Sequence, residues 1–209
     1  MKFTDGFKEA ILQLPEKEKD KLLLRLLKKD IKLVNRLNFE LLQPMSVEDA
    51  RTELEEKIKL KIKRLTTTKY VGNVYMMELR YMSGDIAEHL STTKDKYGDV
   101  YLQLFMIHEF LTKMNAQIAT YPMRLTEKLN KYIIAKLFKL MILIQAMHED
   151  LQYDFKDMLT EISIMMGENP NLMHTAMYNG LDANWLIDLQ IPETISEIYK
   201  DLRSRGYLR

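Results

Sequence analysis

A long apolar segment, from Thr126 to about Met166, places the strongest constraint on how this chain can fold. Apolar residues recur along it at spacings of three and four, which lines one face of an α-helix. Around Tyr132 to Leu143, further apolar side chains cover a second face. A helix that is apolar around most of its circumference has to be buried on several sides. We therefore predict a long central helix with other helices packed around it and, as an alternative, a break of this segment near Asp150 to Asp154.

The segment before the central helix has an apolar pattern of its own. Apolar residues from Val100 to Ile118 keep a heptad-like spacing, and Pro122 ends the pattern. The connection to the central segment is short, which favours an antiparallel pair. Glycine and proline are sparse, at 7 and 5 residues, and no strand-like alternation persists. The predicted fold class is all-α, a multi-helix bundle around a long central apolar helix paired antiparallel with the preceding helix.

Capping residues divide the first half of the chain into further helices. We predict helices over residues 6–14, from Pro15 onward, over residues 31–43 after an Asp30 cap, and over residues 46–65 after a Ser46–Asp49 capping box. A fifth helix over residues 73–91 is expected to kink or split at Gly84. Residues 91–98 are predicted to be a loop, with Asp99 capping the next helix. The predicted organisation is a single all-helical domain over residues 1–209, with residues 1–43 as an N-terminal three-helix subdomain.

The composition excludes several kinds of site. The chain has no cysteine, which excludes disulfides, thiolate zinc sites, iron–sulfur clusters and cysteine nucleophiles, and suits a cytoplasmic protein. Charged residues interrupt the N-terminus where a secretory signal needs an apolar core. The longest run without a polar residue in the central segment, Leu140 to Ile144, is far shorter than the roughly 20 residues of a membrane span. We expect a cytoplasmic protein that is not inserted in a membrane.

The four histidines provide the candidate metal ligands. Inward-facing imidazoles from several helices of a bundle can bind a metal, and the candidates are His108 and His148. However, neither His-x-x-x-His nor Glu-x-x-His occurs, and these are the spacings that place two ligands on one helix face. We therefore predict no cofactor and keep a metal-dependent helical-bundle hydrolase as an alternative.

Basic residues in the N-terminal helices provide a candidate nucleic-acid surface. Residues 14–25 resemble the opening of the helix-turn-helix region of bacterial sigma factors, although the turn and recognition helix of that family have no counterpart in residues 29–42. The resemblance implies DNA binding, but interleaved acidic residues dilute the positive field that a phosphate backbone needs. The candidate residues are Lys21, Arg25, Lys28, Lys29, Lys32 and Arg36.

Fifteen methionines are the most unusual feature of the composition. Methionine fills irregular cores and also forms adaptable binding grooves. Most of these residues fall at predicted inward positions, which indicates a methionine-rich core. Because the searches for chemistry find no complete site, the leading hypothesis is a non-catalytic cytoplasmic protein-interaction module. It would bind a protein partner or self-associate. Nucleic-acid binding and metal-dependent hydrolysis are the alternatives, so whether the chain is an enzyme stays open.

Overall fold

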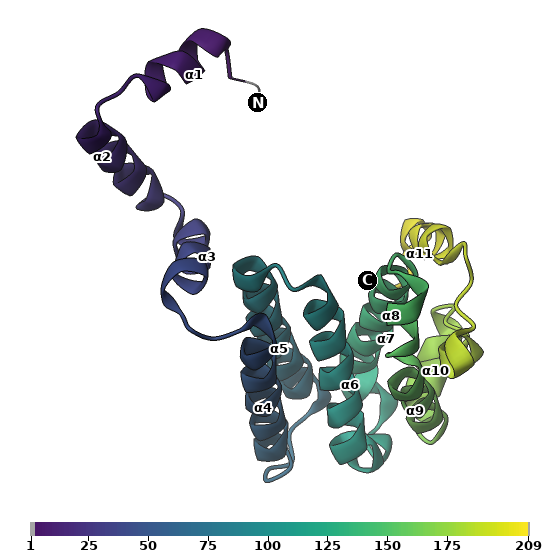
Figure 1. The fold of residues 1–209 in the computed structure, drawn as a ribbon. Helices are drawn as coiled ribbons and strands as arrows, with labels where there is room; N and C mark the ends of the chain where they lie inside the picture. Colours follow the sequence, from purple (N-terminus) through teal and green to yellow (C-terminus); the bar gives the residue numbers. More distant parts are fainter. Residues whose placement is uncertain (1–2, 209) are drawn as a thin grey trace. The chain divides into compact units, whose positions relative to one another are not determined.

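The computed structural model describes residues 3–208, which form eleven α-helices, one 3-10 helix and no β-strand (Figure 1). This confirms the all-α fold class. No helix within these residues is long and apolar enough to cross a membrane. In chain order the elements are α1 (Asp5–Leu12), α2 (Glu16–Leu27), α3 (Ile31–Leu42), α4 (Val47–Leu65), α5 (Gly72–Thr93), α6 (Lys96–Ala119), α7 (Met123–Gln145), α8 (Glu149–Tyr153), α9 (Lys156–Gly167), α10 (Pro170–Tyr178), η1 (Ala183–Leu189) and α11 (Ile195–Ser204).

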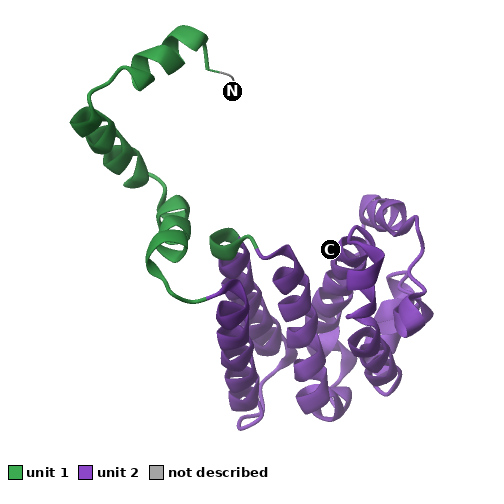
Figure 2. Cartoon of the chain, viewed as in Figure 1, with its two compact units in different colours: residues 1–45, 91–94 green, residues 46–90, 95–209 purple. Residues whose placement is uncertain are grey.

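The chain divides into two compact units, coloured separately in Figure 2. The first comprises the segment that ends at Met45, with α1, α2 and α3, together with Ser91–Lys94. The second comprises Ser46–Leu90 and the chain from Asp95 onward. The second unit contains the hydrophobic core, since no residue of α1, α2 or α3 is buried.

Helix starts in the first half of the chain follow from side-chain caps. Asp30 accepts a hydrogen bond from the Leu33 amide at 3.1 Å and begins α3. Ser46 and Asp49 form the predicted reciprocal capping box at the start of α4. Pro15 precedes the first helical residue of α2 and acts as its N-cap. The Asp30 and Ser46 side chains satisfy amide groups that have no partner within the helix, whereas α1 and α2 begin without a side-chain cap.

Successive helices of the second unit stack as hairpins. The α4–α5 pair is joined by the Lys61–Asp85 ion pair, with Nζ and Oδ2 2.5 Å apart. Helix α4 packs against α6, and α6 packs against both α7 and α9, while α7 packs against α10 (Figure 1). Each hairpin therefore meets its neighbours in the stack, an arrangement in which stability comes from interfaces between adjacent layers.

The segment over residues 126–166 is three helices, so the prediction of one unbroken central helix is wrong, while the alternative break near residues 150–154 lies close to the junction of α8 and α9. Helix α7 ends at Gln145, α8 is a short helix, and α9 begins at Lys156. No proline or glycine marks the first break. Instead, the Gln152 side-chain amide donates to the carbonyl oxygens of Gln145 and Met147, at 3.4 and 2.9 Å, and satisfies groups at the end of α7. The structure does not confirm a single central helix, since α6 has more buried residues than α7.

Two predictions around α5 are also wrong. Helix α5 continues through Gly84 without a split, with Met82 and Ile86 buried on either side of the glycine. The predicted loop over residues 91–98 is short, because α5 extends to Thr93 and α6 begins at Lys96. Asp95, rather than Asp99, caps α6 by accepting a hydrogen bond from the Gly98 amide at 2.8 Å.

Methionines contribute to the core of the second unit. Met82, Met106, Met114, Met141 and Met166 are buried. Four others pack partly buried against the core, namely Met76, Met147, Met158 and Met165. Met77, predicted to point inward, is instead 48% exposed.

Candidate functional site

The first feature with functional content is the surface of α1, α2 and α3. All three helices are amphipathic in sequence, yet each leaves its large apolar side chains in solvent. Leu41 and Leu42 are 74% and 76% exposed. The other exposed large apolar residues of this segment are Phe3, Phe7, Leu12, Leu23, Leu24, Leu26, Ile31, Leu33 and Met45. Large apolar side chains left exposed on three consecutive helices are characteristic of surfaces that a partner covers.

Helix α2 carries a leucine face, which we define as Leu22, Leu23, Leu26 and Leu27. At 100° per residue, Lys17, Lys21 and Lys28 lie on the opposite side of the helix. The charges around the leucine face differ between its two ends. Glu16, Glu18 and Asp20 lie beside it near the start of α2, where Lys19 falls at the centre of the face, and Lys29 lies beside it near the end.

The candidate nucleic-acid residues all lie in or beside α2 and α3. Lys21 forms an ion pair with Glu18 at 2.9 Å, and Arg36 forms one with Glu40 at 2.6 Å. Lys29 lies beside the leucine face, Arg25 lies toward the opposite side of α2, and Lys28 is the C-cap of α2. Lys32 is exposed on α3. Two of the six cations are therefore partly neutralised, and nucleic-acid binding stays a prediction.

The two candidate metal ligands are engaged in different local contacts. His108 on α6 pairs with Glu161 on α9, with Nε2 and Oε2 2.5 Å apart. His148 is exposed at the N-cap of α8, where Nδ1 lies 3.4 Å from the Asp150 amide and 3.2 Å from its carboxylate. Within residues 3–208 no group of three or more His, Asp or Glu side chains is placed to hold a metal ion. Metal-dependent hydrolysis has no assembled ligand set to support it there.

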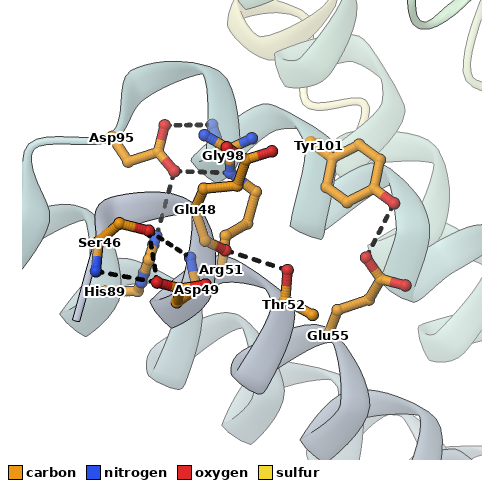
Figure 3. Close-up of polar contacts among 10 residues, drawn as sticks. All are labelled: Ser46, Glu48, Asp49, Arg51, Thr52, Glu55, His89, Asp95, Gly98 and Tyr101. Atoms are coloured by element: carbon orange, nitrogen blue, oxygen red, sulfur yellow. Dashed lines mark hydrogen bonds and ion pairs between the residues drawn. The ribbon is translucent and has the colours of Figure 1, made fainter.

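A buried carboxylate, not identified from the sequence, joins three helices (Figure 3). Asp95 is 8% exposed. Its Oδ2 accepts a hydrogen bond from Nε of Arg51 on α4 at 2.8 Å and lies 3.3 Å from Nε2 of His89 on α5, while Oδ1 accepts from the Gly98 amide on α6. Burial alone would raise the pKa of Asp95, but the hydrogen bonds from Arg51, Gly98 and His89 outweigh it and hold the pKa below its ordinary value.

Beyond the Asp95 carboxylate, side chains at spacings of four on α4 contact side chains at spacings of four on α6. The Arg51 guanidinium lies 5.0 Å from the centre of the Tyr97 ring, and Lys59 Nζ lies 5.4 Å from that of Phe105. Between them, the Tyr101 hydroxyl donates to Glu55 at 2.9 Å. Burial, followed by this hydrogen bond, raises the pKa of Tyr101 to about 12. The matched order of the contacts shows that α4 and α6 run parallel.

The Asp95 cluster is best described as a structural joint. Both carboxylate oxygens have donors from the protein, and the charge of Arg51 is balanced by that of Asp95. A general base needs a lone pair directed at substrate, and these donors occupy the carboxylate instead. The spacing of four between charged residues on α4 and between aromatic residues on α6 was present in the sequence. The register that pairs the charged residues of α4 with the aromatic residues of α6 could not be read from the sequence.

Similarity to known proteins adds no further information about these features. A scan against protein-family models, a search of curated proteins and a search of solved structures find no match to this chain.

Proposed function

We propose that this chain is a non-catalytic, cytoplasmic protein-interaction module that binds a second copy of itself through α1, α2 and α3. The observation that carries the proposal is the absence of any buried residue from these three helices, although their sequences have apolar faces. Helices of 8 to 12 residues are only marginally stable alone in water, because most helical stability in proteins comes from packing an apolar face. A partner that covers these faces would supply that packing.

The free energy available from burying the exposed leucine side chains supports a binding surface. Burying a leucine side chain contributes about 1.5–3 kcal/mol. Leu23 and Leu26 on the leucine face are each 54% exposed, so roughly half of that gain remains to be made at each position when a partner binds. Exposed apolar residues on α1 and α3 extend the surface well beyond four leucines.

Charge complementarity favours a second copy as the partner. Three acidic residues flank the leucine face near the start of α2, around the single cation Lys19, and Lys29 flanks it near the end. Two α2 helices packed antiparallel about a two-fold axis would place Glu18 of one copy near Lys29 of the other, twice in one interface. A parallel pair would place like charges together. The leucines would meet at the centre of the antiparallel arrangement.

Interface area requires all three helices. A stable protein interface buries about 1,200–2,000 Å² in total, with about 20–30 residues from each partner. The 12 residues of α2 are too few, but α2 with α1 and α3 reaches this range. The proposed interface therefore contains the leucine face at its centre and apolar residues of α1 and α3 around it.

The first test is the mass of the full chain in sedimentation velocity over a range of concentrations. We expect a dimer for the unmodified chain and at least tenfold weaker association for the Leu23→Glu/Leu26→Glu variant. The matched control is Leu60→Glu/Leu143→Glu, which changes two leucines of the second unit that are 56% and 44% exposed. The control is expected to remain dimeric. A chain that stays monomeric at 100 µM (about the highest concentration of the series) would overturn the proposal.

A charge exchange then identifies the partner as a second copy. Glu18→Lys alone and Lys29→Glu alone should each weaken association, since each places like charges together across the two-fold axis. The double variant should restore it. Failure of the double variant to restore association would contradict the antiparallel pairing and favour a partner of different sequence.

A further inference from the structure

A groove on the second unit lies between α5, α7 and the turn after α11, and we call it the α5–α7 groove. Its larger part is a cavity of about 500 Å³ lined by Met76, Arg80, Glu127, Lys128, Lys131, Tyr132, Ala135 and Leu208. A smaller cavity of about 270 Å³ adjoins it, sharing Lys131 and Leu208 and continuing to Tyr178 and Arg205. Together they reach the volume of pockets that bind ligands in proteins.

The wall formed by the C-terminal turn is held firmly in place. The Leu208 amide donates to Oδ1 of Asn179 at 3.0 Å, and the Leu208 carbonyl accepts a hydrogen bond from Arg203. Asn179 is itself 1% exposed and donates to the Thr175 carbonyl at 2.9 Å. Leu208 has a φ of 59°, a left-handed conformation that is unfavourable for leucine. The surrounding hydrogen bonds therefore fix this side chain at the edge of the groove despite backbone strain.

The rim of the groove has an excess of positive charge. Arg80 and Lys128 form no ion pair with any residue among positions 3–208. Lys131 pairs with Glu127 at 2.8 Å, and Arg205 pairs with Asp201 at 2.9 Å. Two cations thus remain without a partner carboxylate. Lys136 and Lys139 continue the basic stripe along α7 beyond the cavity.

The floor of the groove is apolar. Met76, Ala135 and Leu208 supply aliphatic surface. The Tyr132 hydroxyl is turned away to the Ser83 hydroxyl, 2.7 Å distant, so the groove receives the ring and not the polar group. A ligand that fits both parts carries an apolar group for the floor and anionic groups for the rim.

We propose that the α5–α7 groove binds an acidic peptide segment of a partner protein, in which carboxylates flank an apolar side chain. Carboxylates would pair with Arg80 and Lys128, and the apolar side chain would occupy the floor. The two adjoining cavities, which share Lys131 and Leu208, leave room for more than one residue of a peptide. Nucleic acid fits less well, because Glu127 and Asp201 lie along the groove and the Tyr178 and Tyr207 rings already pack edge to face, 5.8 Å apart. This site is independent of α1, α2 and α3.

The test is selection of a random 12-residue peptide library, displayed on phage, against the full chain. We expect the selected peptides to be enriched in Asp and Glu beside Leu, Ile or Phe. A selected peptide, synthesised with a fluorescent label, should bind at least tenfold more weakly to the Arg80→Glu/Lys128→Glu variant. The matched control, Lys63→Glu/Arg64→Glu, makes the same charge change at two exposed positions of α4 and should change affinity less than twofold.

A second variant tests the floor without changing charge. Ala135→Trp fills the cavity and should also abolish peptide binding, with helix content by circular dichroism confirming that each variant is folded. Selected peptides without acidic enrichment, or binding that is the same in all variants, would overturn the proposal. A fluorescent oligothymidine that binds the unmodified chain more tightly than the peptide, and is lost in the Arg80→Glu/Lys128→Glu variant, would reassign the groove to single-stranded nucleic acid.

Discussion

The guanidinium of Arg51 and the carboxylate of Asp95 lie 2.8 Å apart, although 44 positions separate the two residues in the sequence. Only 22% of the Arg51 side chain and 5% of the Asp95 side chain are exposed, so this ion pair is shielded from water on most sides. It connects α4 to the start of α6, with His89 of α5 on the same carboxylate oxygen. The Asp95 cluster therefore joins the first two hairpins at one end, beside the further α4–α6 contacts of Glu55 with Tyr101 and Lys59 with Phe105.

Removing the cation of this pair should destabilise the second unit. Arg51→Met leaves Asp95 buried without its strongest donor, and the expected loss of unfolding free energy is about 2–3 kcal/mol, somewhat below that of a fully buried pair. Urea denaturation followed by circular dichroism measures it. Lys57→Met, which breaks an exposed pair with Glu53, should cost about 0.5 kcal/mol or less. Equal losses in the two variants would show that the Asp95 cluster contributes nothing special.

The Asp95 carboxylate should make the free energy of unfolding depend on pH. Because the pKa of Asp95 is held below its ordinary value of 3.8, the folded state favours the ionised form. This contribution is fully present well above pH 3.8 and is lost as the pH falls through 3.8 toward the lower pKa of the folded state. Urea denaturation at about pH 6 and at about pH 3.5, where the loss has begun, should show a larger drop for the unmodified chain than for Asp95→Asn. The prediction fails if the two drops are equal.

Two glycines of α5 should respond oppositely to alanine. A Cβ atom at Gly72 would lie 2.2 Å from the Leu125 carbonyl oxygen, so Gly72→Ala forces α5 away from the start of α7 and should cost about 2 kcal/mol or more. A Cβ atom at Gly84 meets nothing within 4 Å, so Gly84→Ala should stabilise by about 0.5–1 kcal/mol through helix propensity. Melting temperatures of the two variants compare them directly. A stabilising Gly72→Ala would contradict the close approach of the two helices.

Two asparagines form a buried relay between α6 and α10. The Asn169 side chain donates to Asn115 at 3.0 Å and accepts from the Leu172 amide at 3.1 Å, while Asn115 donates to the Met165 carbonyl. Asn169→Ala removes a helix cap and deprives Asn115 of its donor, so the expected loss is about 2–3 kcal/mol.

An exposed cap provides the comparison for this relay. Asp182→Ala removes only the cap of η1, which Asp182 forms by accepting from the Asn184 amide, and should cost about 1 kcal/mol. Chemical denaturation of both variants under the same conditions separates the cap from the buried relay. A loss at Asn169 no larger than that at Asp182 would mean that the bond to Asn115 has no net value.

Features set by neighbouring residues were predictable from the sequence. The Ser46–Asp49 capping box and the Asp30 cap depend on three-residue spacings, and both are present. Lys57 and Lys59 each follow a glutamate by four residues on α4, and both ion pairs are formed, at 2.6 and 2.7 Å. In each case the physical cause lies within one helical turn.

Features that depend on packing between layers were not predictable. The end of α7 carries no proline or glycine, and the side chain that stabilises the break, Gln152, looks like an ordinary surface residue in the sequence. Gly84 suggested a kink because propensity was weighed without the neighbouring helices. No local sequence pattern predicts the contact between Arg51 and Asp95, because only the packing of α4 beside α6 brings the two residues together.

The single tryptophan gives the second unit a spectroscopic label at one end of its stack. Trp185 in η1 packs edge-on against Phe138 of α7, with ring centres 6.3 Å apart. Its emission will therefore change when η1 separates from α7, whereas the far-ultraviolet signal reports every helix. If fluorescence and ellipticity trace the same denaturation curve, all hairpins melt together. Two separate curves would reveal that the α4–α6 layers and the layers around Trp185 unravel at different times.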